Sequence, residues 1–129
     1  MAIIDLEDKI IELVTKKDHS EFIFDFLQVY DISNSTVTRL KKGNLNKATH
    51  LGEVHLKNKV FFKEVTDGDL FKGFSKVESE ISKLSAKPRY IIITDYIGLL
   101  AKDTRTHETL DITFVELPQY FDFFLAWNN

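Results

Sequence analysis

The apolar pattern between positions 70 and 94 constrains the fold of this 129-residue chain more than any other feature. Apolar residues recur there at helical spacing and predict a helix from about Leu70 to Leu84. Its apolar face consists of Leu70, Phe74, Val77, Ile81 and Leu84. Lys87-Pro88 separates this helix from the continuous apolar run 90–94 (Tyr-Ile-Ile-Ile-Thr), which is typical of a central strand covered on both faces. A helix leading into such a strand predicts a crossover connection, and therefore a parallel strand pair.

Short β-rich runs on both sides of this segment complete the predicted sheet. Before it lie 52–56 and 60–65, joined by Lys57-Asn58-Lys59, a plausible hairpin turn because Asn tolerates a left-handed backbone. After it lie 99–102 and 110–115. Because the hairpin pairs are antiparallel and the crossover pair is parallel, the sequence predicts a mixed sheet.

Helices are predicted at both ends of the chain. Three N-terminal helices are expected at about 4–16, 20–30 and 33–42, and a C-terminal helix at about 119–126. The last helix is so apolar that we expect it to pack against another part of a longer protein. The prediction is one α/β domain over 1–129, with a central mixed sheet flanked by helices, as one piece of a longer chain.

Composition excludes several classes of protein. Without cysteine, the chain has no disulfide, thiolate metal site or thiol nucleophile, which fits a reducing compartment. The acidic N-terminus is unlike a signal peptide, and the apolar runs are too short to span a bilayer. We therefore expect a cytoplasmic protein with no membrane partner.

Basic residues gather between positions 39 and 63, although the net charge is −3. They are Arg39, Lys41, Lys42, Lys47, Lys57, Lys59 and Lys63. One interpretation is a solvated basic hairpin, and the other is a surface that faces nucleic acid. On the second interpretation the candidate DNA-binding residues are Arg39, Lys41, Lys42, Lys57 and Lys59.

The order of helix, β-hairpin, helix and strand resembles the core of PD-(D/E)xK nucleases, which implies a restriction-endonuclease-like fold. In that fold one hairpin strand carries an acid and the next carries an acid-x-lysine, and the carboxylates hold Mg²⁺. A three-residue turn pairs Leu56 with Val60, and so places Glu53 opposite Lys63 on one face, with Cβ atoms ~5 Å apart. Glu53 is accordingly the candidate metal ligand, and Glu53 and Lys63 are candidate catalytic residues.

The resemblance breaks at Phe61, which stands two residues before Lys63 where the second acid belongs. Glu64 points to the opposite face of a regular strand, and Glu21 on the second helix is a candidate further carboxylate. One strand acid and one lysine make a poor Mg²⁺ site, since that ion needs oxygen ligands. Three interpretations stay open: an exposed cross-strand ion pair, an active Mg²⁺-dependent nuclease, and a vestigial site with a binding role.

Isolated polar residues carry less information. The spacing of His19, His50, His55 and His107 matches no metal motif, and we expect these histidines to be exposed. Asp95 and Asp103 each follow a strand at a turn, where Asp commonly accepts hydrogen bonds from backbone amides.

Five stretches of the chain together resemble the N-terminal domain of large bacterial restriction–modification proteins. They lie at 21–27, 38–43, 59–63, 88–95 and 110–127. In that family one chain resembles an adenine-specific DNA methyltransferase with a nuclease-like N-terminal region. The resemblance implies DNA as a partner and a methyltransferase domain downstream, and S-adenosylmethionine would bind only there. It implies Mg²⁺ only for an active nuclease.

The resulting hypothesis is a nuclease-like N-terminal domain that contributes DNA contact, inter-domain packing or Mg²⁺-dependent cleavage. The alternative is a non-catalytic protein-interaction module with no role in nucleic-acid binding. Salt-sensitive DNA binding distinguishes the two, because phosphate contacts weaken steeply with salt.

Overall fold

The computed structural model describes residues 3–30, 32–42, 53–56, 58–65, 69–84 and 87–128. The N-terminal half contains α1 (Ile3–Thr15), α2 (Phe22–Val29), α3 (Asn34–Lys41), β1 (Glu53–Leu56) and β2 (Val60–Glu64). The C-terminal half contains α4 (Leu70–Ser82), β3 (Tyr90–Thr94), β4 (Gly98–Asp103), β5 (Thr109–Thr113) and the 3-10 helical segment η1 (Phe114–Asn128). The predicted helices and strands are all present, with shifted ends.

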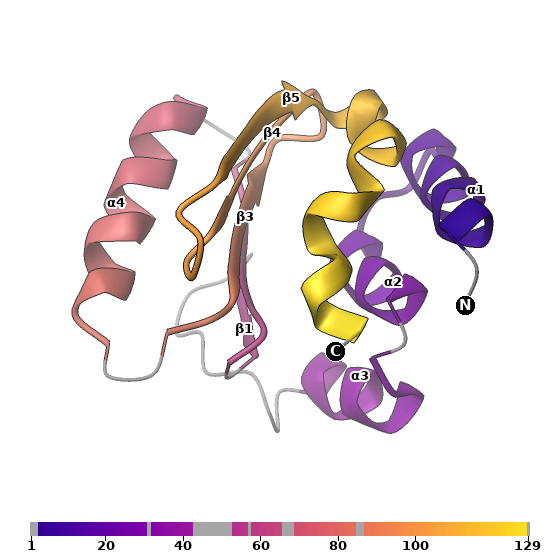
Figure 1. Ribbon diagram of the computed structural model, residues 1–129, viewed down its shortest axis with the longest axis horizontal. Coiled ribbons are helices and arrows are strands. Elements are labelled where there is room, and N and C mark those ends of the chain that lie inside the picture. Colours follow the sequence, from indigo (N-terminus) through magenta and orange to yellow (C-terminus); the bar gives the residue numbers. More distant parts are fainter. Residues whose placement is uncertain are drawn as a thin grey trace.

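The five strands form one sheet in the order β1-β2-β3-β4-β5. β2 and β3 are parallel and the other neighbouring pairs are antiparallel, so the predicted mixed sheet with a crossover through α4 is confirmed. Figure 1 shows three layers, with α4 alone on one side of the sheet and α1, α2, α3 and η1 on the other. We call these the α4 face and the broad face.

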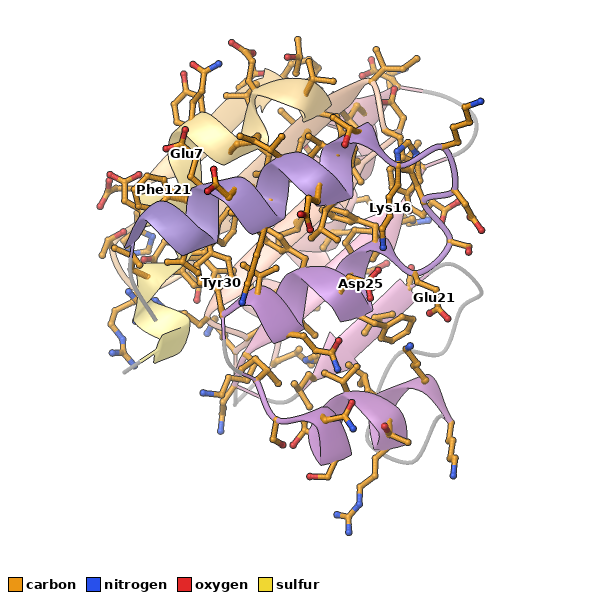
Figure 2. The ribbon with its side chains drawn as sticks, turned by 90° about the vertical axis from the view of Figure 1, so that its right-hand side faces the viewer. Glu7, Lys16, Glu21, Asp25, Tyr30 and Phe121 are labelled. Carbon is orange, nitrogen blue, oxygen red and sulfur yellow. The ribbon has the colours of Figure 1, made fainter. Side chains whose placement is uncertain are left out.

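Aromatic side chains dominate the core on the broad face. Phe26 meets Tyr30 and Phe124 edge to face, with ring centroids 5.3 and 5.2 Å apart, and Tyr90 of β3 lies 5.0 Å from Phe124. The Tyr30 hydroxyl donates a hydrogen bond of 2.6 Å to the carbonyl of Phe121, and these two residues lie together in Figure 2. Burial raises the pKa of Tyr30, so its phenol remains a donor. The core therefore joins the N-terminal helices to η1.

The C-terminal segment differs from its prediction. β5 ends at Thr113 because the Glu116 carboxylate accepts hydrogen bonds from the Thr113 amide and hydroxyl, at 2.8 and 2.9 Å. The following segment is kinked at Tyr120. Leu117 and Phe124 are fully buried in the domain's own core, while Phe121, Phe123 and Leu125 are only partly buried, so packing of this segment against a further domain stays an expectation.

The α4 face has a smaller core, formed by Phe61, Val77, Ile81, Ile91 and Ile93. Asp69 is the N-cap of helix α4, and its side chain accepts a hydrogen bond from the amide of Phe71. It ends at Ser82, earlier than predicted, and leaves Leu84 exposed. The broad face, on the other side of the sheet, carries the larger share of the apolar burial, because four helical segments cover it.

Side-chain caps hold the turns as the sequence predicts. Asn58 has a left-handed φ of 64° in the β1–β2 turn. Asp95 accepts hydrogen bonds from the amides of Ile97 and Gly98, and Asp103 accepts them from those of Arg105 and Thr106. Among the helices of the described residues, none has the length and apolar character needed to cross a membrane.

Candidate functional site

The Glu53–Lys63 pair lies on the α4 face with the predicted register. Glu53 pairs with Lys63 across β1 and β2, and Leu56 pairs with Val60. The Glu53 carboxylate is 3.7 Å from the Lys63 amine, which confirms an ion pair. The pair is not exposed as expected, because the Glu53 side chain keeps only 7% of its surface accessible. Its position next to the small core explains this burial.

Phe61 occupies the strand position where a nuclease needs its second acid. Its side chain points to the α4 face and packs with Val77, Ile81 and Ile91 in the small core, and His55 approaches its ring edge to face at 5.5 Å. A carboxylate at this position would be removed from water without a partner. Phe61 is therefore a structural residue of the core, which removes one metal ligand.

The neighbouring acid, Glu64, faces the broad side, as strand alternation predicts. Its carboxylate accepts a hydrogen bond of 3.2 Å from the Tyr96 hydroxyl. Burial and the negative charge of Glu64 raise the pKa of Tyr96, which keeps the phenol protonated. Glu64 is thus held on the other face from Lys63 and does not complete an acid-x-lysine group.

Glu21 does not reach the Glu53–Lys63 pair, because the sheet lies between them. It precedes α2 in the helical layer of the broad face, near Asp25 and Lys16 in Figure 2, and pairs with Lys41 at 3.5 Å. Within the described ranges, no group of three His, Asp or Glu residues could hold a metal ion. The candidate catalytic residues therefore do not assemble into one site.

The predicted DNA-binding residues lie at one end of the molecule. Arg39, Lys41 and Lys42 are exposed at the end of α3, and Lys41 also lies 5.5 Å from the Phe24 ring centroid. Lys59 is half-buried in the β1–β2 turn, and Lys57 lies outside the described residues. The α3 helix and this turn occupy the same end in Figure 1.

The histidines differ from the expectation of exposure. The His19 ring stacks on Tyr96 at 4.7 Å and meets Phe114 edge to face at 5.0 Å, while its Nε2 atom is buried without a hydrogen-bond partner. His55 is half-buried, and His107 is exposed as predicted. His50 lies outside the described residues.

Two residues that the sequence did not single out line a hollow of about 350 Å³ on the α4 face. Lys72 and Lys76 of α4 border it together with Lys63 of β2. The rest of the lining consists of Glu64, Val65, Asp69 and Gly73. The sequence signal was the spacing of four residues between the two lysines, which places them on one face of a helix.

The whole chain is similar in sequence to known proteins. A family model described as "MmeI, N-terminal domain" matches residues 1–129. DNA methyltransferase A of Bacillus subtilis (strain 168) is 61% identical over 129 residues. The aligned region is the whole of this chain but 15% of that protein, so the chain spans a small part of the relative's length. No solved structure gives a significant match. The family resemblance drawn from the sequence is thereby confirmed.

Proposed function

Because the chain belongs to the family of MmeI N-terminal domains, we propose that it is a nuclease-like domain that contacts DNA without cutting it. The observation that carries the proposal is Phe61, which is 7% exposed and fills the small core where a cleaving site needs an acid. The order of hairpin, crossover helix and strand supports a restriction-endonuclease-like ancestry, in which fold and ion pair were kept and catalysis was lost.

The residues on the α4 face do not fit a Mg²⁺ site. Mg²⁺ requires near-octahedral oxygen ligands. Glu53 supplies one carboxylate, which already faces the Lys63 amine, and Phe61 supplies no ligand. No cleavage step is therefore assigned to this domain. S-adenosylmethionine would bind in a downstream domain, since the longer relative is named a DNA methyltransferase. In this proposal that downstream domain is a partner in the same chain, and both work in the bacterial cytoplasm.

The exposed basic residues at the end of α3 are the proposed DNA contact. Arg39 and Lys42 have no ion-pair partner among the described residues, so their charge is available to phosphates. Lys59 would add to this surface from the β1–β2 turn at the same end, and Lys57, outside the described residues, stays a candidate from the sequence. A helix C-terminus also favours basic residues by itself. Binding measurements must therefore separate DNA contact from helix stabilisation.

Fluorescence anisotropy with a labelled duplex tests the DNA contact. We expect the affinity to fall steeply between about 50 and 200 mM salt, as for any phosphate-contacting surface. The double variant Arg39→Glu/Lys42→Glu should bind more weakly, with a salt slope smaller by about 2. Lys9→Glu/Lys17→Glu carries the same charge change on other exposed positions and should bind nearly as the wild type does. Salt-insensitive or absent binding by the wild type would reject the proposal.

A plasmid-nicking assay tests the absence of cleavage. Supercoiled DNA should stay intact in Mg²⁺ at enzyme concentrations that saturate binding, because the site lacks its second acid. Nicking that requires Mg²⁺, stops in EDTA and disappears in Lys63→Ala would show that the site is an active nuclease instead. The Lys83→Ala variant, at the far end of α4, controls for loss of a lysine alone.

A protein-interaction module is the second candidate, and exposed apolar residues favour it. Phe71, Ile97 and Val115 are 60, 79 and 67% exposed. Ile97 and Val115 lie at one end of the sheet, where the Phe114 amide donates to the Ile97 carbonyl at 2.9 Å. Protein contacts are marked by contiguous apolar patches rather than single exposed residues, so the neighbouring Ile97 and Val115 carry this candidate. This function predicts a domain that shows no salt-sensitive binding to the duplex.

A further inference from the structure

Three lysines line the hollow of the α4 face, and they come from two different elements. Lys63 projects from β2, and Lys72 and Lys76 project from α4. The two helical lysines are both exposed and lie one turn apart, so they border the same side of the helix. The hollow, of about 350 Å³, is large enough for a phosphate group and its hydration.

The acids near the hollow are already engaged by other groups. Glu53 faces Lys63, and the Glu64 carboxylate accepts the Tyr96 hydroxyl. Asp69 accepts the Phe71 amide as the N-cap of α4, so that amide is not a binding group either. Lys72 and Lys76, in contrast, have no hydrogen-bond or ion-pair partner within the part of the chain that the structure describes. The positive charge of these two lysines is therefore available to an anionic ligand.

The position of Lys72 is electrostatically adverse for the helix. It lies in the first turn of α4, which follows the N-cap Asp69 and holds no further acidic residue. The N-terminal end of a helix carries a partial positive charge, so a cation there destabilises the helix while an anion stabilises it. A solvated helix face gains nothing from this arrangement. A bound oxyanion would offset the repulsion among Lys72, Lys76 and the helix end.

We propose that Lys72 and Lys76, with Lys63 behind them, form a second DNA-contact site that takes a phosphodiester oxyanion of the duplex. The proposal rests on the DNA-contacting function proposed above and assigns it a further surface. The N-terminal end of α4 and the basic end of α3 lie at opposite ends of the sheet in Figure 1. The two surfaces can therefore be changed independently.

Charge reversal at the two ends of α4 tests this site. In Lys72→Glu/Lys76→Glu we expect the duplex affinity at about 50 mM salt to fall roughly tenfold or more, and the salt slope to shrink by about 2. The matched control Lys83→Glu/Lys87→Glu carries the same charge change at the other end of the helix. It should change the affinity less than about twofold.

Thermal denaturation of the same variants separates a binding role from a structural one. Lys72→Glu/Lys76→Glu should leave the melting temperature within about 2 °C of the wild type, because both side chains are exposed and make no ion pair within the described residues. The control should lower it slightly. A variant that keeps its melting temperature and binds DNA less well cannot be explained by misfolding.

The outcomes distinguish this inference from the proposed function. If the wild type binds the duplex with a steep salt dependence and Lys72→Glu/Lys76→Glu binds equally well, the second site is wrong and the α3 surface stands. If the wild type does not bind the duplex at all, the proposed function fails. If inorganic phosphate raises the melting temperature of the wild type alone, while duplex binding is unchanged in the variant, the hollow takes a free phosphate and the DNA assignment is overturned.

Discussion

The two faces of the sheet differ in the helices that cover them and in their charged pairs. Four helical segments and a network of aromatic rings cover the broad face, and its charged pair, Arg89 and Asp103, makes two hydrogen bonds of 2.8 Å. One helix covers the α4 face, where the Glu53–Lys63 pair is 3.7 Å long and Lys102 of β4 pairs with Glu78 of α4 at 2.6 Å. The buried pair of the broad face is thus held by two short hydrogen bonds, whereas the Glu53–Lys63 pair is longer. Exposed basic residues without an ion-pair partner among the described residues lie on both sides of the sheet, at Arg39 and Lys42 and at Lys72 and Lys76.

This difference leaves one of the two proposed DNA surfaces, at Lys72 and Lys76, on the face with the smaller core, while the other lies at the end of α3 on the face with the larger core. Apolar burial is the dominant favourable term in folding, so the face with the larger core should govern the free energy of unfolding. Charges on the smaller face can then change without loss of the fold.

The largest expected effect comes from the broad face. Phe26→Ala removes a fully buried ring and should lower the free energy of unfolding by about 4 kcal/mol. Ile81→Ala on the α4 face should cost about 2–3 kcal/mol, because its smaller side chain leaves a smaller cavity. Urea unfolding followed by circular dichroism measures both. Equal losses would mean that the two faces contribute alike.

The second-largest expected effect on stability is that of replacing the Asp103 carboxylate. Its burial would raise the pKa, but hydrogen bonds from Arg89, Arg105 and Thr106 outweigh burial and lower the pKa below the ordinary 3.8. A carboxyl whose folded pKa is lowered stabilises the fold above its unfolded pKa, and this stability is lost as pH falls through the folded pKa. Asp103→Asn should therefore cost about 3 kcal/mol at pH 7.

The pH dependence provides the check on Asp103. The difference in melting temperature between wild type and Asp103→Asn should be full at pH 6 and should shrink below about pH 4, where the wild-type carboxyl becomes protonated. Asp111→Asn on the exposed side of β5 is the control and should match the wild type. A constant difference from pH 7 to pH 3 would show that ionisation of Asp103 contributes nothing.

The smallest expected effect is the coupling between Glu53 and Lys63. A double-mutant cycle with Glu53→Gln, Lys63→Met and the double variant should give a coupling energy of about 1 kcal/mol. The long separation and the partial exposure of Lys63 keep this value below that of the Arg89–Asp103 pair. A coupling above about 3 kcal/mol would place the main electrostatic stabilisation on the α4 face and reverse the comparison.

Much of the sheet was predictable because its signals are local. The run 90–94 has the predicted bounds of β3, and the turn at Asn58 sets the register that places Glu53 opposite Lys63. The C-terminal segment was harder, since its aromatic residues contact several elements and follow no single helical period. The Glu116 bonds to Thr113 that end β5 depend on side-chain geometry that spacing does not reveal.

The candidate site was predictable only in part. The missing acid at Phe61 is visible in the sequence, but its burial by α4 depends on the crossover that folds α4 over β2. Lys72 and Lys76 resemble an ordinary solvated helix face until the strand that brings Lys63 beside them is in place. His19 contacts Tyr96 and Phe114, which lie far along the chain, so no local pattern could indicate its partial burial.

The packing of η1 against α1 and α2 has a consequence for synthesis on the ribosome. The hydrogen bond from Tyr30 to Phe121 joins residues 91 positions apart. A nascent chain emerges from its N-terminus at about 5–20 residues per second. The aromatic face of the first helices is therefore uncovered for several seconds until η1 has been synthesised. During that interval the growing polypeptide exposes an apolar surface, which is the kind of surface that chaperones bind on nascent chains.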